Sequence, residues 1–132
     1  MPSYGYCRKM PIKDWKEHME KKLIQLSVRK FSIVYKHYYA KKFRNNYVGV
    51  SHSPLTRPSE YLGNARNVLP RTGKSHNFVS YKIFTGARRK IDAYDEECKI
   101  YHNMPTEYRS QRNHPAHPDG IDRRCQVQNC TH

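Results

Sequence analysis

The sequence predicts a mainly α-helical protein, in which one long N-terminal helix precedes an extended, irregular arm with little β-structure and no large core of its own. Hydrophobic residues make up 36 % of the 132 residues, fewer than in most globular domains. Eleven of them are tyrosines, which favour half-buried positions. Proline and glycine are absent from residues 12–43 and recur throughout the remainder. A partner is therefore expected to supply the burial that the chain lacks.

Residues 1–11 read as an irregular segment, and residues 12–43 as one amphipathic, basic helix. Pro11 suits the first turn of a helix, and the acidic Asp14 and Glu17 near the N-terminus suit the helix dipole. Apolar residues recur at helical spacing in two stripes. These are Trp15, Met19, Leu23 and Leu26, and then Ile24, Val28, Phe31, Tyr35 and Tyr38.

Residues 44–132 are predicted to form the extended arm. Between residues 47 and 78, six prolines and glycines divide the chain into short pieces. Residues 78–84 (FVSYKIF) alternate in a way that predicts one strand, which Gly86 would end. Residues 92–102 predict a short helix, because apolar side chains recur there at helical spacing.

The positive charge is concentrated in the middle of the chain. Sixteen Lys and Arg residues lie between Lys21 and Ile91, against one acid, Glu60, whereas the whole chain carries +14. Such a stretch favours an acidic partner, which is nucleic acid such as ribosomal RNA, anionic lipid head groups or an acidic protein surface. The ordinary alternative is a solvated basic face.

Two short motifs supply the predicted contacts with this partner. The run Gly-Ala-Arg-Arg-Lys at 86–90 places two guanidinium groups where they can bind phosphate or carboxylate. The segment 71–75 ends like a nucleotide-binding phosphate loop, but Val68 stands where that loop needs its first glycine, which excludes nucleotide hydrolysis. The predicted contact residues are Arg71, Lys74, His76, Arg88, Arg89 and Lys90.

Four residues could in principle bind zinc: Cys98, His102, Cys125 and Cys130, with His114, His117 and His132 nearby. Their spacing matches no strong zinc template, and a disulfide between Cys125 and Cys130 is an alternative. Free thiols are therefore favoured, and neither a metal nor another cofactor is assigned.

Enzymatic activity is not expected. The eight histidines form no recognisable arrangement with a serine or cysteine nucleophile, and acids are too sparse for paired-carboxylate chemistry. No apolar run approaches the ~18 residues that a membrane span requires. The N-terminus lacks the apolar core of a signal peptide, which favours an intracellular location.

Residues 69–90 resemble a stretch of the small alpha-subcomplex subunit seven of mitochondrial respiratory complex I. The matching positions are Leu69, Pro70, Gly73, Ser75, His76, Thr85, Arg88 and Arg89. Lys74 departs from that family's proline, its paired tyrosines are not in place here, and the match needs one gap. The resemblance implies a non-catalytic accessory subunit of the respiratory chain, on the matrix side of the mitochondrion.

Two other structural roles remain open at this point. A helix followed by a basic arm also suits a mitochondrial ribosomal protein, because arginine and aromatic side chains bind RNA phosphates and stack on bases. A protein lining the inside of microtubules is a further alternative, although the sequence contains no internal repeat that would support it.

Overall fold

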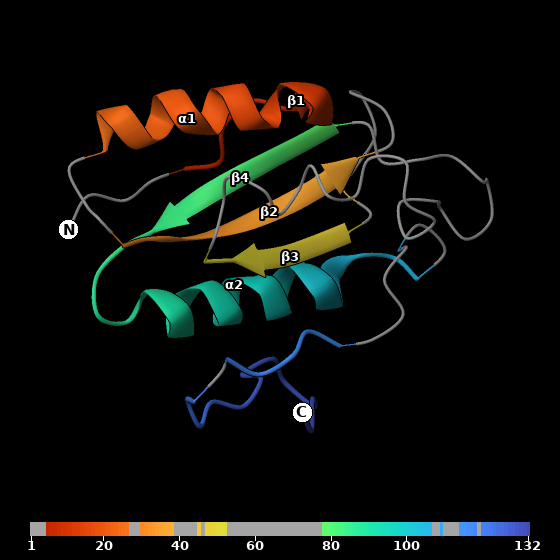
Figure 1. Cartoon of the computed structure of the whole chain (residues 1–132). Helices are drawn as coiled ribbons and strands as arrows, with labels where there is room; N and C mark the ends of the chain where they lie inside the picture. Colours follow the sequence, from red (N-terminus) through yellow and green to blue (C-terminus); the bar gives the residue numbers. More distant parts are fainter. Residues whose placement is uncertain are drawn as a thin grey trace.

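A four-stranded antiparallel sheet with one helix on each face forms the body of the molecule (Figure 1). The computed structural model describes residues 5–26, 30–38, 45, 47–52, 78–106, 109, 114–118 and 120–132. In chain order the elements are β1 (Met10–Pro11), a 3-10 turn (Ile12–Asp14), α1 (Trp15–Gln25), β2 (Ser32–Tyr38), β3 (Tyr47–Ser51), β4 (Phe78–Phe84) and α2 (Arg89–Asn103).

The strand order is β1-β4-β2-β3, so β2 lies inside the sheet and pairs along its length with both β4 and β3. Successive side chains of a strand point to opposite faces. On β2, Ile33 and Tyr35 face α1, whereas Val34 faces α2. Because helices cover both faces, nearly every residue of β2 is buried.

The α1 face holds the larger part of the core. Trp15 and Met19 of α1 are fully buried against odd-numbered residues of β2 and β4. The rings of Trp15 and Tyr81 meet edge to face with their centroids 5.2 Å apart, an arrangement that aromatic pairs prefer. The chain therefore has a dense core of its own on this side.

The core on the α2 face is smaller, and the C-terminal part of the chain adds a fourth layer beyond α2. Val34, Val48 and Tyr101 are buried between the sheet and α2. On the outer side of α2, Cys98 and Cys125 join a third cluster, which attaches the C-terminal part of the chain to the helix. Figure 1 shows this segment lying beyond α2, away from the sheet.

The predicted helix over residues 12–43 is wrong. Helical structure ends at Gln25, Leu26 is extended, and residues 32–38 form β2 instead. Residues four apart, such as Phe31 and Tyr35, share a face in a strand as well as in a helix, so their spacing does not discriminate between the two. The β-branched and aromatic run Ile33-Val34-Tyr35 suits the central strand that pairing on both sides provides.

Two further predictions are wrong: the extended arm over residues 44–132 and the lack of a large core. In the structure, β3, β4 and α2 pack into the body of the molecule. Within that stretch, the strand predicted at 78–84 is confirmed as β4. The short helix predicted at 92–102 is confirmed and begins earlier, at Arg89. Among the described residues, no helix has the length and apolar character to cross a membrane.

Candidate functional site

Polar contacts hold the C-terminal segment, residues 114–118 and 120–132, on the outer side of α2. Arg123 makes a two-pronged contact with Asp95, in which Nε donates to Oδ1 at 3.1 Å and Nη2 donates to Oδ2 at 2.7 Å. The Tyr94 hydroxyl lies 3.2 Å from Nδ1 of His117, and the same nitrogen lies 2.8 Å from the carbonyl oxygen of Arg123. These contacts fix the position of the segment on α2.

Four metal-binding side chains converge where this segment meets the end of α2. They are His102, His114, Cys125 and Cys130, whose ligand atoms all lie within 4.8 Å of one another. Nε2 of His102 is 3.5 Å from Sγ of Cys125, and Nε2 of His114 is 3.5 Å from Sγ of Cys130. This quartet contains no carboxylate and offers two sulfur and two nitrogen donors. We call it the Cys2His2 quartet.

A tight turn brings the two cysteines of the quartet together. The backbone N–H of Cys130 donates to the carbonyl of Val127 at 3.1 Å. Asn129 has a left-handed backbone with a φ of 69°, a conformation that asparagine adopts more readily than most residues. The N–H of Cys125 donates to the carbonyl of His132 at 2.7 Å, which closes the loop.

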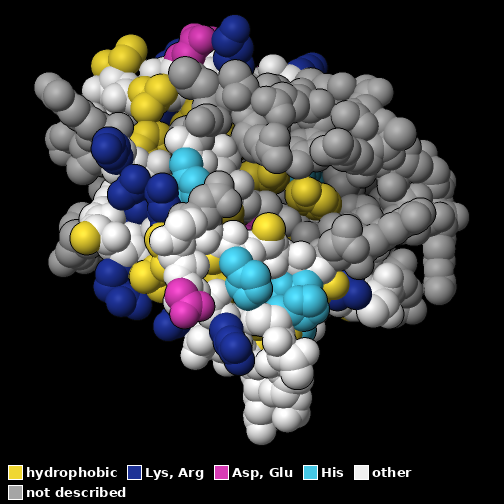
Figure 2. Space-filling view, turned by 60° about the horizontal axis from the view of Figure 1, so that its bottom comes forward, with side chains coloured by type: hydrophobic (Ala, Val, Ile, Leu, Met, Phe, Trp, Pro, Cys, Tyr) yellow, Lys and Arg dark blue, Asp and Glu magenta, His cyan; other side chains and the backbone are white. Residues whose placement is uncertain are grey.

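His114 is oriented by its neighbours. Its Nδ1 lies 2.9 Å from the carbonyl oxygen of Pro115, so Nδ1 donates and Nε2 is left with its lone pair toward Cys130. Burial lowers the pKa of His114 below its usual value, which favours the neutral ring. The ring of His132 stacks on it, with centroids 4.3 Å apart and planes 11° from parallel. Figure 2 shows histidine side chains grouped on this face.

The structure brings together three of the four predicted zinc candidates: His102, Cys125 and Cys130. Cys98 is not a member of the quartet. It is fully buried beside Tyr94 and Cys125, and burial raises the pKa of its thiol to about 12. His114 takes the fourth place. Sequence spacing could not select it over His117 or His132, because only the path of the C-terminal segment decides which imidazole points inward.

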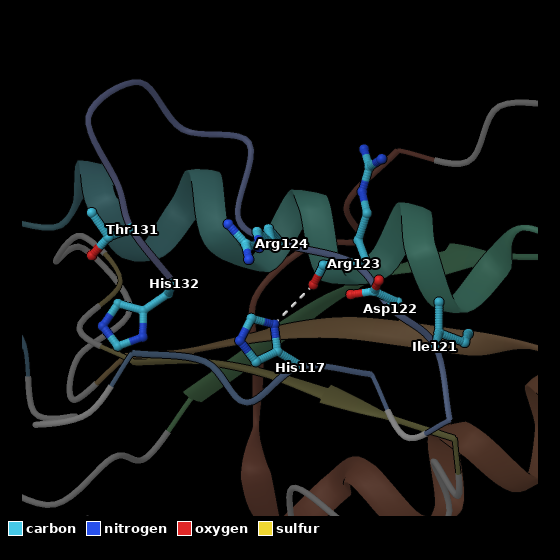
Figure 3. A pocket seen from close by; sticks show the side chains of 7 residues that line it. All are labelled: His117, Ile121, Asp122, Arg123, Arg124, Thr131 and His132. Atoms are coloured by element: carbon cyan, nitrogen blue, oxygen red, sulfur yellow. Dashed lines mark hydrogen bonds between the residues drawn. The ribbon is translucent and has the colours of Figure 1, made fainter.

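Figure 3 shows the lining of a shallow cavity of about 550 Å³ at the C-terminal segment. The cavity adjoins the quartet through His132, whose ring stacks on His114. Its lining residues are His117, Ile121, Asp122, Arg123, Arg124, Thr131 and His132. Arg123 is paired with Asp95, so Arg124 and Asp122 are the remaining charged side chains of opposite sign. Because these two charges balance, the cavity has no strong preference for an anion.

The predicted contact residues Arg88, Arg89 and Lys90 lie at the start of α2. Three cations at a helix N-terminus oppose the helix dipole, and one carboxylate, Asp92, pairs with Arg88 at 3.8 Å. Nε of Arg89 is buried without a hydrogen-bond partner among the described residues.

Lys30 belongs to the same end of the molecule, because β2 begins beside the end of β4, where Ser32 pairs with Phe84. We call Lys30, Arg88, Arg89 and Lys90 the basic end. The other predicted contacts, Arg71, Lys74 and His76, lie outside the described residues, as do positions 69–77 of the segment resembling the complex I subunit.

Comparison with protein-family models, with curated proteins and with solved structures finds no match to this chain. The resemblance of residues 69–90 therefore stays a prediction.

Proposed function

We propose that this chain is a non-catalytic structural protein that binds an acidic partner within a larger assembly. The basic end is the observation that carries the proposal. Three cations lie there at the start of α2 against one carboxylate, and Lys30 lies at the same end of the sheet. An anionic group would offset their mutual repulsion and would also complement the helix dipole.

The charge of the described residues supports the same proposal. They include 16 Lys and Arg against 8 Asp and Glu, a net charge of +8. A field of this sign raises the association rate with acidic surfaces and with nucleic acid. The chain has its own core, so the partner is proposed to bind a folded protein rather than to fold it.

The resemblance of residues 69–90 favours one assembly in particular, the matrix arm of mitochondrial complex I, with this chain as an accessory subunit. Arg88 and Arg89 belong both to that resemblance and to the basic end. A mitochondrial ribosomal protein is the second candidate, and the same two residues favour it, because guanidinium groups bind phosphate in two-pronged fashion. A protein that lines the inside of microtubules is the third candidate, and no feature of the described residues favours it.

Native electrophoresis of gently solubilised organelles, with mass spectrometry of this chain's peptides, tests the proposal. Co-migration with a respiratory complex that contains iron–sulfur subunits would support the accessory-subunit proposal. Co-migration with ribosomal subunits, lost after ribonuclease treatment, would favour the ribosomal candidate. A chain that migrates alone in every fraction would refute the structural role in an assembly.

Charge reversal tests whether the basic end makes the contact. The double variant Arg88→Glu, Arg89→Glu is expected to reduce the assembled fraction at least about tenfold, since it turns attraction into repulsion at the interface. Lys13→Glu, Lys16→Glu is the matched control, because it changes the same charge beside and within α1, away from the basic end. Equal losses in both variants would show that total charge, rather than this surface, determines binding.

A further inference from the structure

We infer that the Cys2His2 quartet binds one Zn²⁺ ion, and that this ion fastens the C-terminal segment to α2. The inference stands apart from the proposed function, because it requires no partner. It rests on the donor atoms of His102, His114, Cys125 and Cys130, which come from the last turns of α2 and from a segment as much as 28 residues further along the chain.

Two nitrogen–sulfur distances within the quartet match tetrahedral zinc. Zinc–sulfur bonds of about 2.3 Å and zinc–nitrogen bonds of about 2.0–2.1 Å, at the tetrahedral angle, place sulfur and nitrogen about 3.6 Å apart. The two nitrogen–sulfur distances, from His102 to Cys125 and from His114 to Cys130, are both 3.5 Å. A single thiol–imidazole hydrogen bond would explain one such distance. Two of them with all four donor atoms within 4.8 Å of one another indicate a common centre.

The donor set selects the metal. Two thiolates and two imidazoles are the ligands of structural zinc sites, whereas calcium and magnesium require oxygen donors, which the quartet does not offer. All four tetrahedral positions are taken by side chains, so no position is left for water or substrate. The geometry therefore points to a structural ion rather than a catalytic one.

Groups around the quartet hold its ligands as a zinc site requires. The carbonyl of Pro115 accepts from Nδ1 of His114, which leaves Nε2 as the ligand atom. The left-handed turn at Asn129 returns Cys130 toward Cys125. On binding, Zn²⁺ replaces the two thiol protons, which pass to solvent, so the complex with two thiolates and two neutral imidazoles carries no net charge.

The other described contacts of the C-terminal segment are mostly polar and only partly buried. Cys125, Val127 and Cys130 are its contribution to the apolar cluster on α2, and most of its other described side chains are exposed. The Arg123–Asp95 pair is partly exposed, with 30 % and 27 % of the side chains accessible, and pairs of this kind contribute little. A metal ion supplies the missing stabilisation, as it does in small domains that fold only when metal is bound.

Metal content of the full chain, purified under reducing conditions, provides the first test. We expect elemental mass spectrometry to find about one zinc ion per chain. After chelation, Co²⁺ is expected to give the strong visible bands of a tetrahedral site and the near-ultraviolet absorption of cobalt–thiolate bonds. A chain that carries no zinc and gives no such spectrum with Co²⁺, or one in which Cys125 and Cys130 form a disulfide under these conditions, would overturn the inference.

Substitutions then locate the ion. Cys130→Ser and His114→Ala are expected to reduce bound zinc several-fold. Cys7→Ser and His18→Ala should retain it, since Cys7 packs on the α1 side of the sheet and His18 belongs to α1 itself. Loss of zinc from the controls to the same extent would contradict the assignment.

Hydrogen exchange separates loss of metal from loss of fold. Chelation is expected to increase amide exchange of residues 120–132 several-fold while β2 and β4 remain protected. Unchanged exchange in that segment, with zinc removed, would show that the ion does not fasten it. This result is independent of whether the chain joins any assembly.

Discussion

Glu97 makes the stability of this protein depend on pH in a direction opposite to that of most carboxylates. It lies on α2 and is 8 % exposed. Burial raises the pKa of its side chain from 4.5 to about 8, with no other cause contributing. Glu97 lines a small cavity, and the other titratable or charged groups that line this cavity are His52, Lys90, Tyr94 and His117. We therefore predict that Glu97→Gln stabilises the protein at neutral pH.

The magnitude follows from the linkage between protonation and folding. Between pH 4.5 and about 8 the unfolded chain has lost the Glu97 proton and the folded chain has kept it. The unfolded state then binds fewer protons, so the free energy of unfolding falls by about 1.4 kcal/mol for each pH unit. At pH 7 the loss relative to pH 4.5 is about 3 kcal/mol, and it levels off above pH 8. Glutamine has the same shape and no charge to bury.

Urea unfolding of the parent and of Glu97→Gln, at pH 5, 6, 7 and 8, measures this effect. The free energy of unfolding of the variant is expected to rise steadily with pH relative to that of the parent, and this gain reaches about 3 kcal/mol at pH 7. Titration of other groups, including the zinc ligands, cancels in the difference between the two proteins. A difference that stays constant with pH would refute the reasoning, because it would show that Glu97 has the same pKa in the folded and unfolded states.

Two further substitutions test the packing. Gly49→Ala would place a Cβ against the ring of Tyr35, which lies opposite in the β2–β3 register and is 1 % exposed, so we expect a loss of about 1–3 kcal/mol in urea unfolding. Gly5→Ala, where an added Cβ meets nothing within 4 Å, is the control. Arg123→Ala is expected to cost at most about 1 kcal/mol and to leave amides 120–132 protected. Full exchange there would show that its pair with Asp95 holds the segment.

Local patterns were sufficient for the strand at 78–84 and for the helix of α2. In each case the pattern spans one element and ends at a clear signal, such as Gly86 after the strand. The same reasoning failed for β2, where apolar spacing of four residues was attributed to a helix. The discriminating information, pairing with β3 and β4 on either side, comes from residues distant in the sequence.

For the candidate metal site, too, the sequence identified some of the residues and the tertiary structure identified the rest. Residue type and order along the chain made His102, Cys125 and Cys130 candidates, although their spacing matched no strong zinc template and free thiols were favoured. They did not distinguish Cys98 from His114. Cys98 is buried in the cluster on the outer side of α2, whereas Nε2 of His114 lies 3.5 Å from Sγ of Cys130.

By itself, the sequence determined the net positive charge, the basic run at 86–90, and the two elements whose periodicity is complete within one stretch of chain. Charge and local periodicity depend on composition and on neighbouring residues alone. The tertiary structure decided the helix-covered sheet, the position of Lys30 at the same end of the sheet as Arg88 and Arg89, and the fourth member of the quartet. Each of these depends on which distant segments pack together, because burial and coordination are satisfied by partners in space rather than by neighbours in sequence.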